Sequence, residues 1–253
     1  SHAHFEQTNA TSGDVGEGTG GFTEPLKRRI VLPAAGPLAD TDHVIGHELV
    51  HAFQFDIGRR QRNGSGIAES PVSKLPLWFI EGMAEYLSIG SEDPHTAMWI
   101  RDAQQTKKMP TVKKLTDPRY FPYRFGEALW SYIAGRWGDL EVGRVLKAAA
   151  RTGDADRALA SELGVSTDTL SLDWHASIKG WVDPITARTE PASRFGRALI
   201  VKGKVGGRYN VGPSLSPDGT RVAYFSEKDL FSIEMFLADA TTGKIIRRVT
   251  RTA

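Results

Sequence analysis

The chain has 253 residues, of which 40% are hydrophobic and 25% charged, and its formal net charge is +2. This balance is ordinary for a globular protein, and the lack of a basic surplus argues against a nucleic-acid partner. No run of about 18 apolar residues occurs, so the sequence predicts no membrane span. Cysteine is absent, which excludes disulfides, a thiol nucleophile and cysteine-bound metal. The first residue is Ser1 and no secretory leader follows, so we expect the natural N-terminus to lie outside this chain.

The N-terminal part predicts a loop, a short strand and then a helix. Residues 1–24 are polar and rich in glycine, whereas the β-branched run RRIVLP at 28–33 predicts a strand closed by proline. Asp40 and Asp42 can cap a following helix. The apolar stripe of that helix consists of Ile45, Leu49, Ala52 and Phe53. Glycines and prolines between about 57 and 76 predict a loop after it.

The middle of the chain predicts a series of helices. We place them at 77–88, from Pro94 to about 106, and near 123–137, 139–151, 155–163 and 167–181. Gly138, Gly153 and Gly164 separate the last four, because glycine commonly follows the end of a helix.

From residue 184 the pattern changes to short β-branched segments. These are RALIVKG (197–203), TRVAYFS (220–226), SIEMFLAD (232–239) and KIIRRVT (244–250), and the turn signals PDG and TTGK separate the last three. We place a domain boundary near 184–195. The predicted fold class is therefore α+β, with a mainly helical domain at 1–183 and a small antiparallel β unit at 192–253.

The segment HELVH at 47–51 is the strongest chemical signal in the sequence. His47 and His51 are four residues apart on a predicted helix, so both imidazoles can reach one metal ion. Glu48 lies about 100° around the helix from His47, where a carboxylate can activate water without binding the metal. The alternative is that this five-residue pattern arose by chance, since it is common in helices.

A third ligand is expected because a catalytic zinc ion takes three protein ligands and keeps one position open. Glu81 lies in the otherwise apolar segment WFIEGMAEY, where burying an unpaired carboxylate is costly. Glu85 follows one turn later on the same face and could accept the free ring N–H of a ligand histidine. The alternative for Glu81 is a solvated position on an amphipathic helix. His43 could in turn complete a three-histidine site, but Glu81 is the better third ligand.

HELVH followed by WFIEGMAEY resembles the gluzincin superfamily of zinc peptidases, which includes thermolysin and the aminopeptidase N group. In the latter, the glutamate of a W-L-N-E-G-F-A helix is the third zinc ligand, and Glu81 matches it. Thermolysin-like members carry E-x-x-x-D, and Glu81 with Glu85 repeats that spacing with glutamate in place of aspartate. The overall resemblance is to bacterial peptidase-MA-like proteins and covers about residues 20–180. It implies one Zn²⁺ per chain and a peptide or protein substrate.

The same resemblance implies a role for tyrosine. Aminopeptidase N relatives stabilise the oxyanion with the tyrosine of a Y-x-x-G motif, and YRFG at 123–126 places Tyr123 in that role. Tyr120 is the alternative. The G-x-M-E-N motif that binds the substrate amine in aminopeptidases is not present, because GGFTEPLKRRIVLP occupies that stretch. The strand RRIVLP could still be the edge on which an extended peptide lies.

The C-terminal segment resembles one blade of a TolB-type β-propeller, through its S-P-D-G and D-x-x-T-G-K turns. A second copy does not occur in the chain, and propellers need about four to eight blades. We therefore expect the remaining blades to belong to a longer parent protein, although the β unit could instead cap the helical domain. Exported bacterial proteins often combine such parts, so the resemblance implies a periplasmic or extracellular location.

The expected activity is zinc-dependent hydrolysis of peptide bonds, with His47, His51 and Glu81 as ligands, Glu48 as general base and Tyr123 at the oxyanion. Two alternatives stay open. One is a zinc hydrolase acting on a non-peptide bond, and the other is a catalytically silent binding module attached to a propeller.

Overall fold

The computed structural model describes residues 20–24, 29–33, 37–60, 71–203, 205–228 and 232–251. The chain divides into two compact units, residues 1–187 and 188–253. The division falls inside the segment 184–195, where the sequence analysis expects a domain boundary. Each unit has its own hydrophobic core. The coarse prediction of an α+β protein is confirmed.

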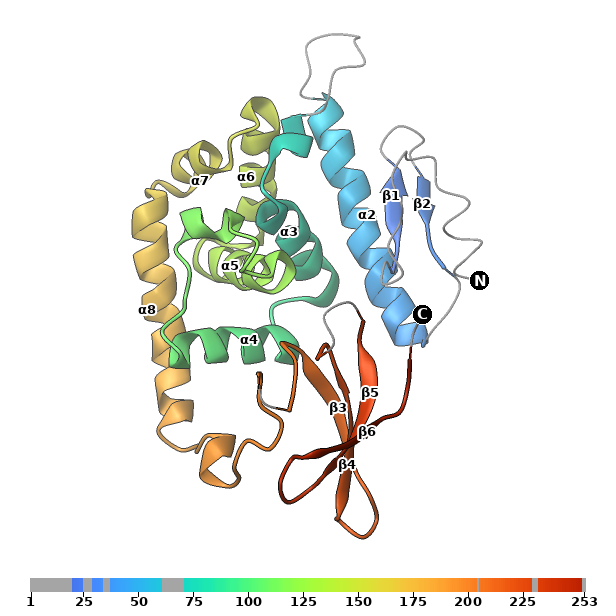
Figure 1. Cartoon of the computed structure of the whole chain (residues 1–253). Coiled ribbons are helices and arrows are strands. Elements are labelled where there is room, and N and C mark those ends of the chain that lie inside the picture. The colour runs from blue at the N-terminus through green and yellow to red at the C-terminus, as the bar shows by residue number, and fades with distance from the viewer. Residues whose placement is uncertain are drawn as a thin grey trace. The chain divides into compact units, whose positions relative to one another are not determined.

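The first unit contains a two-stranded hairpin and a set of helices (Figure 1). The elements are β1 (Phe22–Glu24), β2 (Arg29–Val31), α2 (Leu38–Arg60), α3 (Leu77–Ile89), α4 (Pro94–Gln105), α5 (Pro122–Trp137), α6 (Asp139–Thr152), α7 (Ala155–Leu163) and α8 (Thr167–Thr186). The predicted helices from residue 77 onward are confirmed, and α8 continues five residues beyond its predicted end at 181, with Pro184 in its last turn.

Local signals set the ends of several helices. Asp93 precedes α4 and its side chain accepts a hydrogen bond from the backbone N–H of Thr96 at 2.6 Å. Ser166 caps α8 in the same way. Gly153 and Gly164 follow α6 and α7 with φ of 71° and 70°, a left-handed conformation that glycine adopts without steric cost.

Helices α3 and α5 form the centre of the first unit (Figure 1). Trp78 and Phe79 of α3 pack against Trp130 of α5, whose indole N–H donates to the carbonyl of Phe79 at 3.0 Å. The backbones touch where Gly82 meets Gly126, since a Cβ added to Gly82 would lie 2.3 Å from Gly126 Cα. This close crossing positions the polar face of α3 toward α2.

Helix α2 buries its polar face. The residues buried on it are His47, Glu48, His51, Gln54 and Gly58. The apolar stripe that defines the helix in the sequence instead lies outward, with Ile45, Leu49 and Phe53 exposed to 44%, 46% and 60%. The stripe therefore identifies the helix correctly but not the face that packs.

Several boundaries in this part of the chain differ from prediction. Helix α2 begins at Leu38, so Asp40 and Asp42 lie inside the helix and are not its caps. The helix extends to Arg60, into the loop predicted from about 57, and a 3-10 turn covers Pro71–Lys74. Strand β1 lies within the segment 1–24 that the sequence predicts as loop. The predicted strand at 28–33 is confirmed as the shorter β2, which pairs antiparallel with β1. Residues 1–19 and 61–70, which the sequence predicts as loop, lie outside the described part.

The second unit is an antiparallel sheet with strand order β3-β4-β5-β6. Its strands are β3 (Asn210–Leu215), β4 (Arg221–Ser226), β5 (Glu234–Asp239) and β6 (Ile245–Arg248). Both predicted turns are confirmed, with Gly219 and Gly243 at φ of 69° and 74°. The prediction of a strand at 197–203 is wrong, because only an isolated bridge from Lys202 to Gly206 forms there. Leu199 and Ile200 of this segment pack on the sheet's core instead of extending the ladder.

None of the helices in the described ranges is both long and apolar enough to cross a bilayer.

Candidate metal centre

Two histidines project from one face of α2 and meet at their ring nitrogens. His47 and His51 are one helical turn apart, and their Nε2 atoms lie 3.0 Å from each other. Both residues are buried. The local sequence achieves this without distortion, because residues four apart in a helix share a face.

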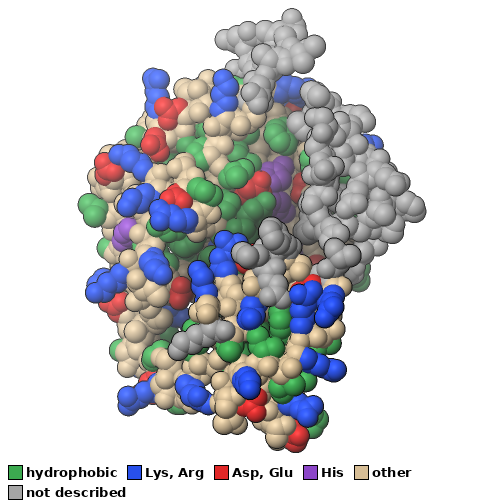
Figure 2. All heavy atoms as spheres, viewed as in Figure 1, with side chains coloured by type: hydrophobic (Ala, Val, Ile, Leu, Met, Phe, Trp, Pro, Cys, Tyr) green, Lys and Arg blue, Asp and Glu red, His purple; other side chains and the backbone are tan. Residues whose placement is uncertain are grey.

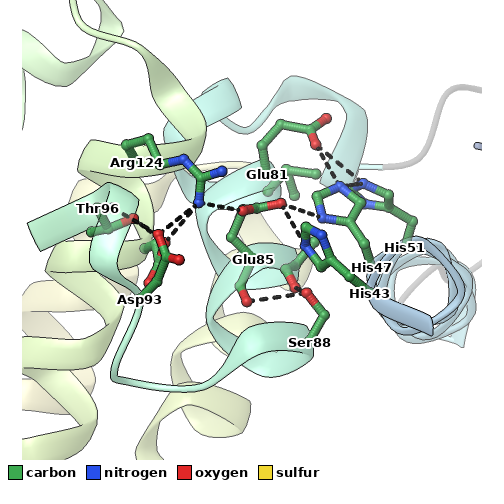
Figure 3. A network of polar contacts seen from close by, with 12 residues as sticks. His43, His47, His51, Glu81, Glu85, Ser88, Asp93, Thr96 and Arg124 are labelled. Carbon is green, nitrogen blue, oxygen red and sulfur yellow. Dashed lines mark hydrogen bonds and ion pairs between the residues drawn. The ribbon is translucent and has the colours of Figure 1, made fainter. Parts of the chain in front are cut away.

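Glu81 of α3 completes a group of three donors (Figure 3). Its Oε2 lies 3.1 Å from His47 Nε2 and 3.2 Å from His51 Nε2. Three ligands bound at about 2.0–2.1 Å to a tetrahedral ion lie about 3.3 Å from one another, so these separations fit zinc. The two imidazoles and one carboxylate are also the donor types that catalytic zinc uses.

The outer nitrogens of the two rings face polar partners. Gln54, one turn after His51, accepts from His51 Nδ1 at 2.8 Å through its Oε1. Its amide nitrogen donates to the carbonyl of Ile80 at 3.0 Å, and this second bond fixes the orientation of the amide. His51 Nδ1 must therefore carry the proton, which leaves the lone pair of Nε2 directed at Glu81.

His47 has a comparable but less well aligned partner. Its Nδ1 lies 3.0 Å from Glu85 Oε1, yet the approach is too oblique for a regular hydrogen bond. With Nδ1 of both rings protonated, two nitrogen lone pairs and the Glu81 carboxylate converge on one point. Such a group of acceptors needs a shared proton or a cation between its members, and a metal ion satisfies all three at once.

The pKa values of His47 and Glu81 are shifted in the directions that favour a positive charge between the donors. Burial would lower the pKa of His47, but the contact with Glu81 and the close negative charges of Glu81 and Glu85 outweigh it and raise that pKa to about 9. Burial would likewise raise the pKa of Glu81, whereas His47 and His51 lower it to about 2. A proton can therefore supply the positive charge that this group needs, and the binding of a metal ion would release it.

Glu48 is buried next to the donors but does not belong to the converging group. The hydroxyl of Thr23 in β1 lies 2.6 Å from Glu48 Oε2 and 2.8 Å from the Glu48 backbone carbonyl. Gly21 permits this approach, because a Cβ there would lie 2.8 Å from Glu48 Cγ and 2.7 Å from Val44. The first strand of the hairpin thus fixes the Glu48 carboxylate through Thr23.

Tyr123 stands over the first histidine. Its ring stacks on that of His47, with centroids 5.8 Å apart and planes inclined by 19°. Burial, together with the charge and hydrogen bond of Glu81, raises the pKa of Tyr123 well above its usual value. The phenol therefore keeps its proton and is available as a donor. Tyr120, the alternative, packs against Phe125 at 5.4 Å between ring centroids.

Arg124 links the centre to the adjoining helices (Figure 3). Its Nη1 lies 3.0 Å from Glu85 Oε2, 3.1 Å from Asp93 Oδ2 and 3.4 Å from Glu127 Oε2. One guanidinium thus holds three carboxylates from α3, the start of α4 and α5. His43 contacts the other oxygen of Glu85, with its Nε2 at 3.2 Å from Oε1. The third histidine of the α2 face therefore does not point at the three donors.

The histidines of α2 differ in exposure, because His43 is partly exposed whereas His47 and His51 are each exposed to only 8%. Figure 2 shows histidine side chains in a hollow on one face of the molecule, with acidic and hydrophobic side chains beside them.

The sequence interpretation named the converging residues but missed several that support them. Gln54 could have been found, because it continues the spacing of His47 and His51 on the same helix face. Arg124 follows Tyr123 directly, but nothing in the sequence indicates its three partners. Thr23 carries no sequence signal, since only the pairing of β1 with the long helix brings it to Glu48. No known protein family, curated protein or solved structure matches this chain.

Proposed function

We propose that the protein is a zinc-dependent hydrolase of peptide bonds and belongs with the gluzincin-type peptidases. The observation that supports this most strongly is the convergence of His47 Nε2, His51 Nε2 and Glu81 Oε2 at 3.0–3.2 Å. A structural zinc site would have four protein ligands, whereas three leave a position open for chemistry.

Each of the surrounding residues has a defined task in this proposal. Zinc held by the three donors would supply an activated water and polarise the substrate carbonyl. Glu48 takes the proton of the attacking water and later delivers it to the leaving amine. Thr23 holds one oxygen of that carboxylate and leaves the other for proton transfer. Tyr123 donates its O–H to the oxygen on which negative charge develops.

We also propose that the second unit is one blade of a β-propeller. The four-stranded antiparallel order β3-β4-β5-β6, with tight turns after β3 and β5, supports this interpretation. Asp218 and Asp239 stabilise those turns by accepting hydrogen bonds from the hydroxyls of Thr220 and Thr242, each at 2.8 Å.

Metal content and turnover of matched variants test the proposed function. Wild-type protein, purified without added metal and analysed by mass spectrometry, should contain about one zinc per chain, and Glu81→Ala should lose it. Glu48→Gln should keep the zinc but lose at least about a thousandfold in kcat on a peptide substrate. Tyr123→Phe should keep the zinc and lose about a hundredfold in kcat.

The control is Glu92→Gln, which changes an exposed glutamate outside the donor group. A panel of peptide and ester substrates separates a peptidase from a hydrolase of other bonds. The absence of bound metal in the wild type after zinc is offered would contradict the proposal. Unchanged turnover in Glu48→Gln would contradict the role of that carboxylate.

A further inference from the structure

A cavity of about 770 Å³ lies between α4, α5 and α8 in the first unit. This size lies within the range of small-molecule sites in proteins. None of the three metal donors lines it, so it is a separate space. The cavity therefore requires its own explanation.

The cavity has a buried carboxylate in its wall. Glu127 of α5 lines it although only 1% of the residue is exposed. In the described part of the chain, both of its hydrogen bonds go to Oε2, one from the hydroxyl of Thr96 and one from Arg124 at 3.4 Å. The other oxygen, Oε1, is left for a ligand.

The charges around Glu127 favour a cation. Glu92 and Asp93 also line the cavity, and Arg124 contacts both Asp93 and Glu127 through its Nη1. Arg136 also lines the cavity, but Asp173 and the hydroxyl of Tyr132 hold its guanidinium at 2.6 and 2.7 Å. The described cavity lining thus has three carboxylates, whereas its one cation, Arg136, is held by Asp173.

Aromatic and aliphatic side chains form part of the remaining wall, beside the hydroxyl groups of Ser131 and Ser177. Trp174 and Trp181 of α8 line the cavity together with Ile100 and Ile178, and Trp181 is 40% exposed. Aromatic faces bind flat apolar groups and also attract organic cations through their quadrupole.

We propose that this cavity binds a protonated organic amine with a flat apolar body, whose ammonium group donates to Glu127 Oε1 and whose body lies against Trp174 and Trp181. The inference rests on the cavity and its carboxylate, so it is independent of the activity of the metal centre.

Three indole probes that differ in one group test the charge preference. Tryptamine carries an ammonium, tryptophol a hydroxyl and indole-3-acetate a carboxylate. Binding to the full chain at pH 7.5, measured by calorimetry or protein-observed NMR, should be about tenfold tighter for tryptamine than for tryptophol. Indole-3-acetate should bind more weakly than either.

Two variants locate the site. Glu127→Gln keeps an acceptor for Thr96 and should abolish the preference for tryptamine while retaining tryptophol binding. Gly135→Trp should block all three probes, because Gly135 lines the cavity and a Cβ there meets nothing within 4 Å. Glu162→Gln on α7 is the matched control and should behave as wild type.

The following binding results would contradict the proposed amine site. Equal affinity for tryptamine and tryptophol, or no binding of tryptamine at 10 mM, would overturn the proposal. So would a tryptamine preference that survives Glu127→Gln or binding that survives Gly135→Trp. The zinc content of each variant is measured in parallel, and it should remain that of the wild type throughout.

Discussion

Gln54 orients a ring of the candidate metal centre and also joins two helices. It accepts from His51 Nδ1 at 2.8 Å and donates to the Ile80 carbonyl at 3.0 Å, so it connects α2 to α3 across the centre. A side chain with no solvent exposure must satisfy both its donor and its acceptor within the protein. The amide therefore fixes both the orientation and the tautomer of the His51 ring.

Replacement of Gln54 should weaken metal binding, because it removes the hydrogen bond to His51. We expect Gln54→Ala to reduce zinc affinity by 10–100-fold, about the usual effect of removing a hydrogen-bond partner of a ligand histidine. Gln54→Glu should recover part of that loss, because a carboxylate still accepts from His51. Competition with a chromophoric chelator measures both affinities. Gln105→Ala, an exposed amide on α4, is the control, and an unchanged affinity in Gln54→Ala would show that the ring needs no such support.

Glu127 makes the stability of the fold depend on pH. Burial of the Glu127 carboxyl group raises its pKa most strongly, and the negative charge of Asp93 raises it further. The hydrogen bond from the Thr96 hydroxyl and the positive charge of Arg124 lower it. The resulting pKa of Glu127 is about 7, compared with 4.5 for a free glutamate. The folded state thus binds the Glu127 proton more tightly than the unfolded state does. The stabilisation from this proton is complete below pH about 4.5 and is lost as the pH rises through about 7.

Glu127→Gln should remove this loss because its side chain stays neutral at every pH. Up to about 3 kcal/mol of the decline in unfolding free energy between pH 4.5 and 8 should disappear in the variant. Urea unfolding at several pH values measures this, with Glu162→Gln as control. If the wild type and Glu127→Gln show the same pH dependence, Glu127 is ionised throughout this range.

At the scale of whole elements, the crossing of α3 and α5 determines the geometry of the centre. Glu81 precedes Gly82 on α3, and Tyr123 lies one turn before Gly126 on α5. The two glycines are in backbone contact, since a Cβ on Gly126 would lie 2.2 Å from the Trp78 carbonyl oxygen. The glycines of the EG and YRFG motifs therefore serve packing, because the close backbone contact brings the segments of Glu81 and Tyr123 together.

Gly126→Ala should force the two helices apart. The added methyl group meets backbone atoms, which cannot move aside as a side chain can, so we expect a loss of about 3 kcal/mol in unfolding free energy. Zinc affinity should also fall in the molecules that remain folded, because α3 carries Glu81. Gly135→Ala in the same helix is the matched control. It meets nothing within 4 Å and should stabilise the protein by up to about 1 kcal/mol. Equal stability of the two variants in thermal unfolding would contradict the close crossing.

At the scale of the whole molecule, the sequence predicts what periodicity and local chemistry determine. Most of the helices, the two β turns and the shared helix face of His47 and His51 depend on spacing or on turn residues, which one sequence contains. Glu81 is indicated by its apolar surroundings and by the resemblance of its motif. The exposed stripe of α2 was not predictable, because an apolar stripe is equally consistent with burial. Thr23 and Arg124 depend on contacts between distant segments, and such contacts leave no periodic signal. Residues 197–203 have the composition of a strand, but a strand also needs a neighbouring strand with which to form hydrogen bonds. The apolar side chains of Leu199 and Ile200 pack on the sheet instead.

The division into two units leads to a prediction about their independence. All residues of the candidate centre lie between 20 and 127, and the large buried cluster of the first unit draws its members from 72 to 182. Helix α8 ends at Thr186, and the backbone N–H of Ala187 donates to the Asp183 carbonyl at 2.9 Å. A chain that stops at Ala187 thus retains this last turn. It also retains every side chain that supports the metal donors.

We therefore expect residues 1–187 alone to fold and to bind zinc with the stoichiometry of the full chain. The thermal midpoint of this helical unit should change by less than about 5 °C, because all the described members of its core cluster lie within the shortened chain. Circular dichroism at 222 nm and metal analysis of both chains provide the comparison. The same shortened chain with Glu81→Ala is the control for specific binding. If the shortened chain loses its helical signal or its zinc, the sheet contributes to the stability of the helical unit, and the two units must be treated as one cooperative fold.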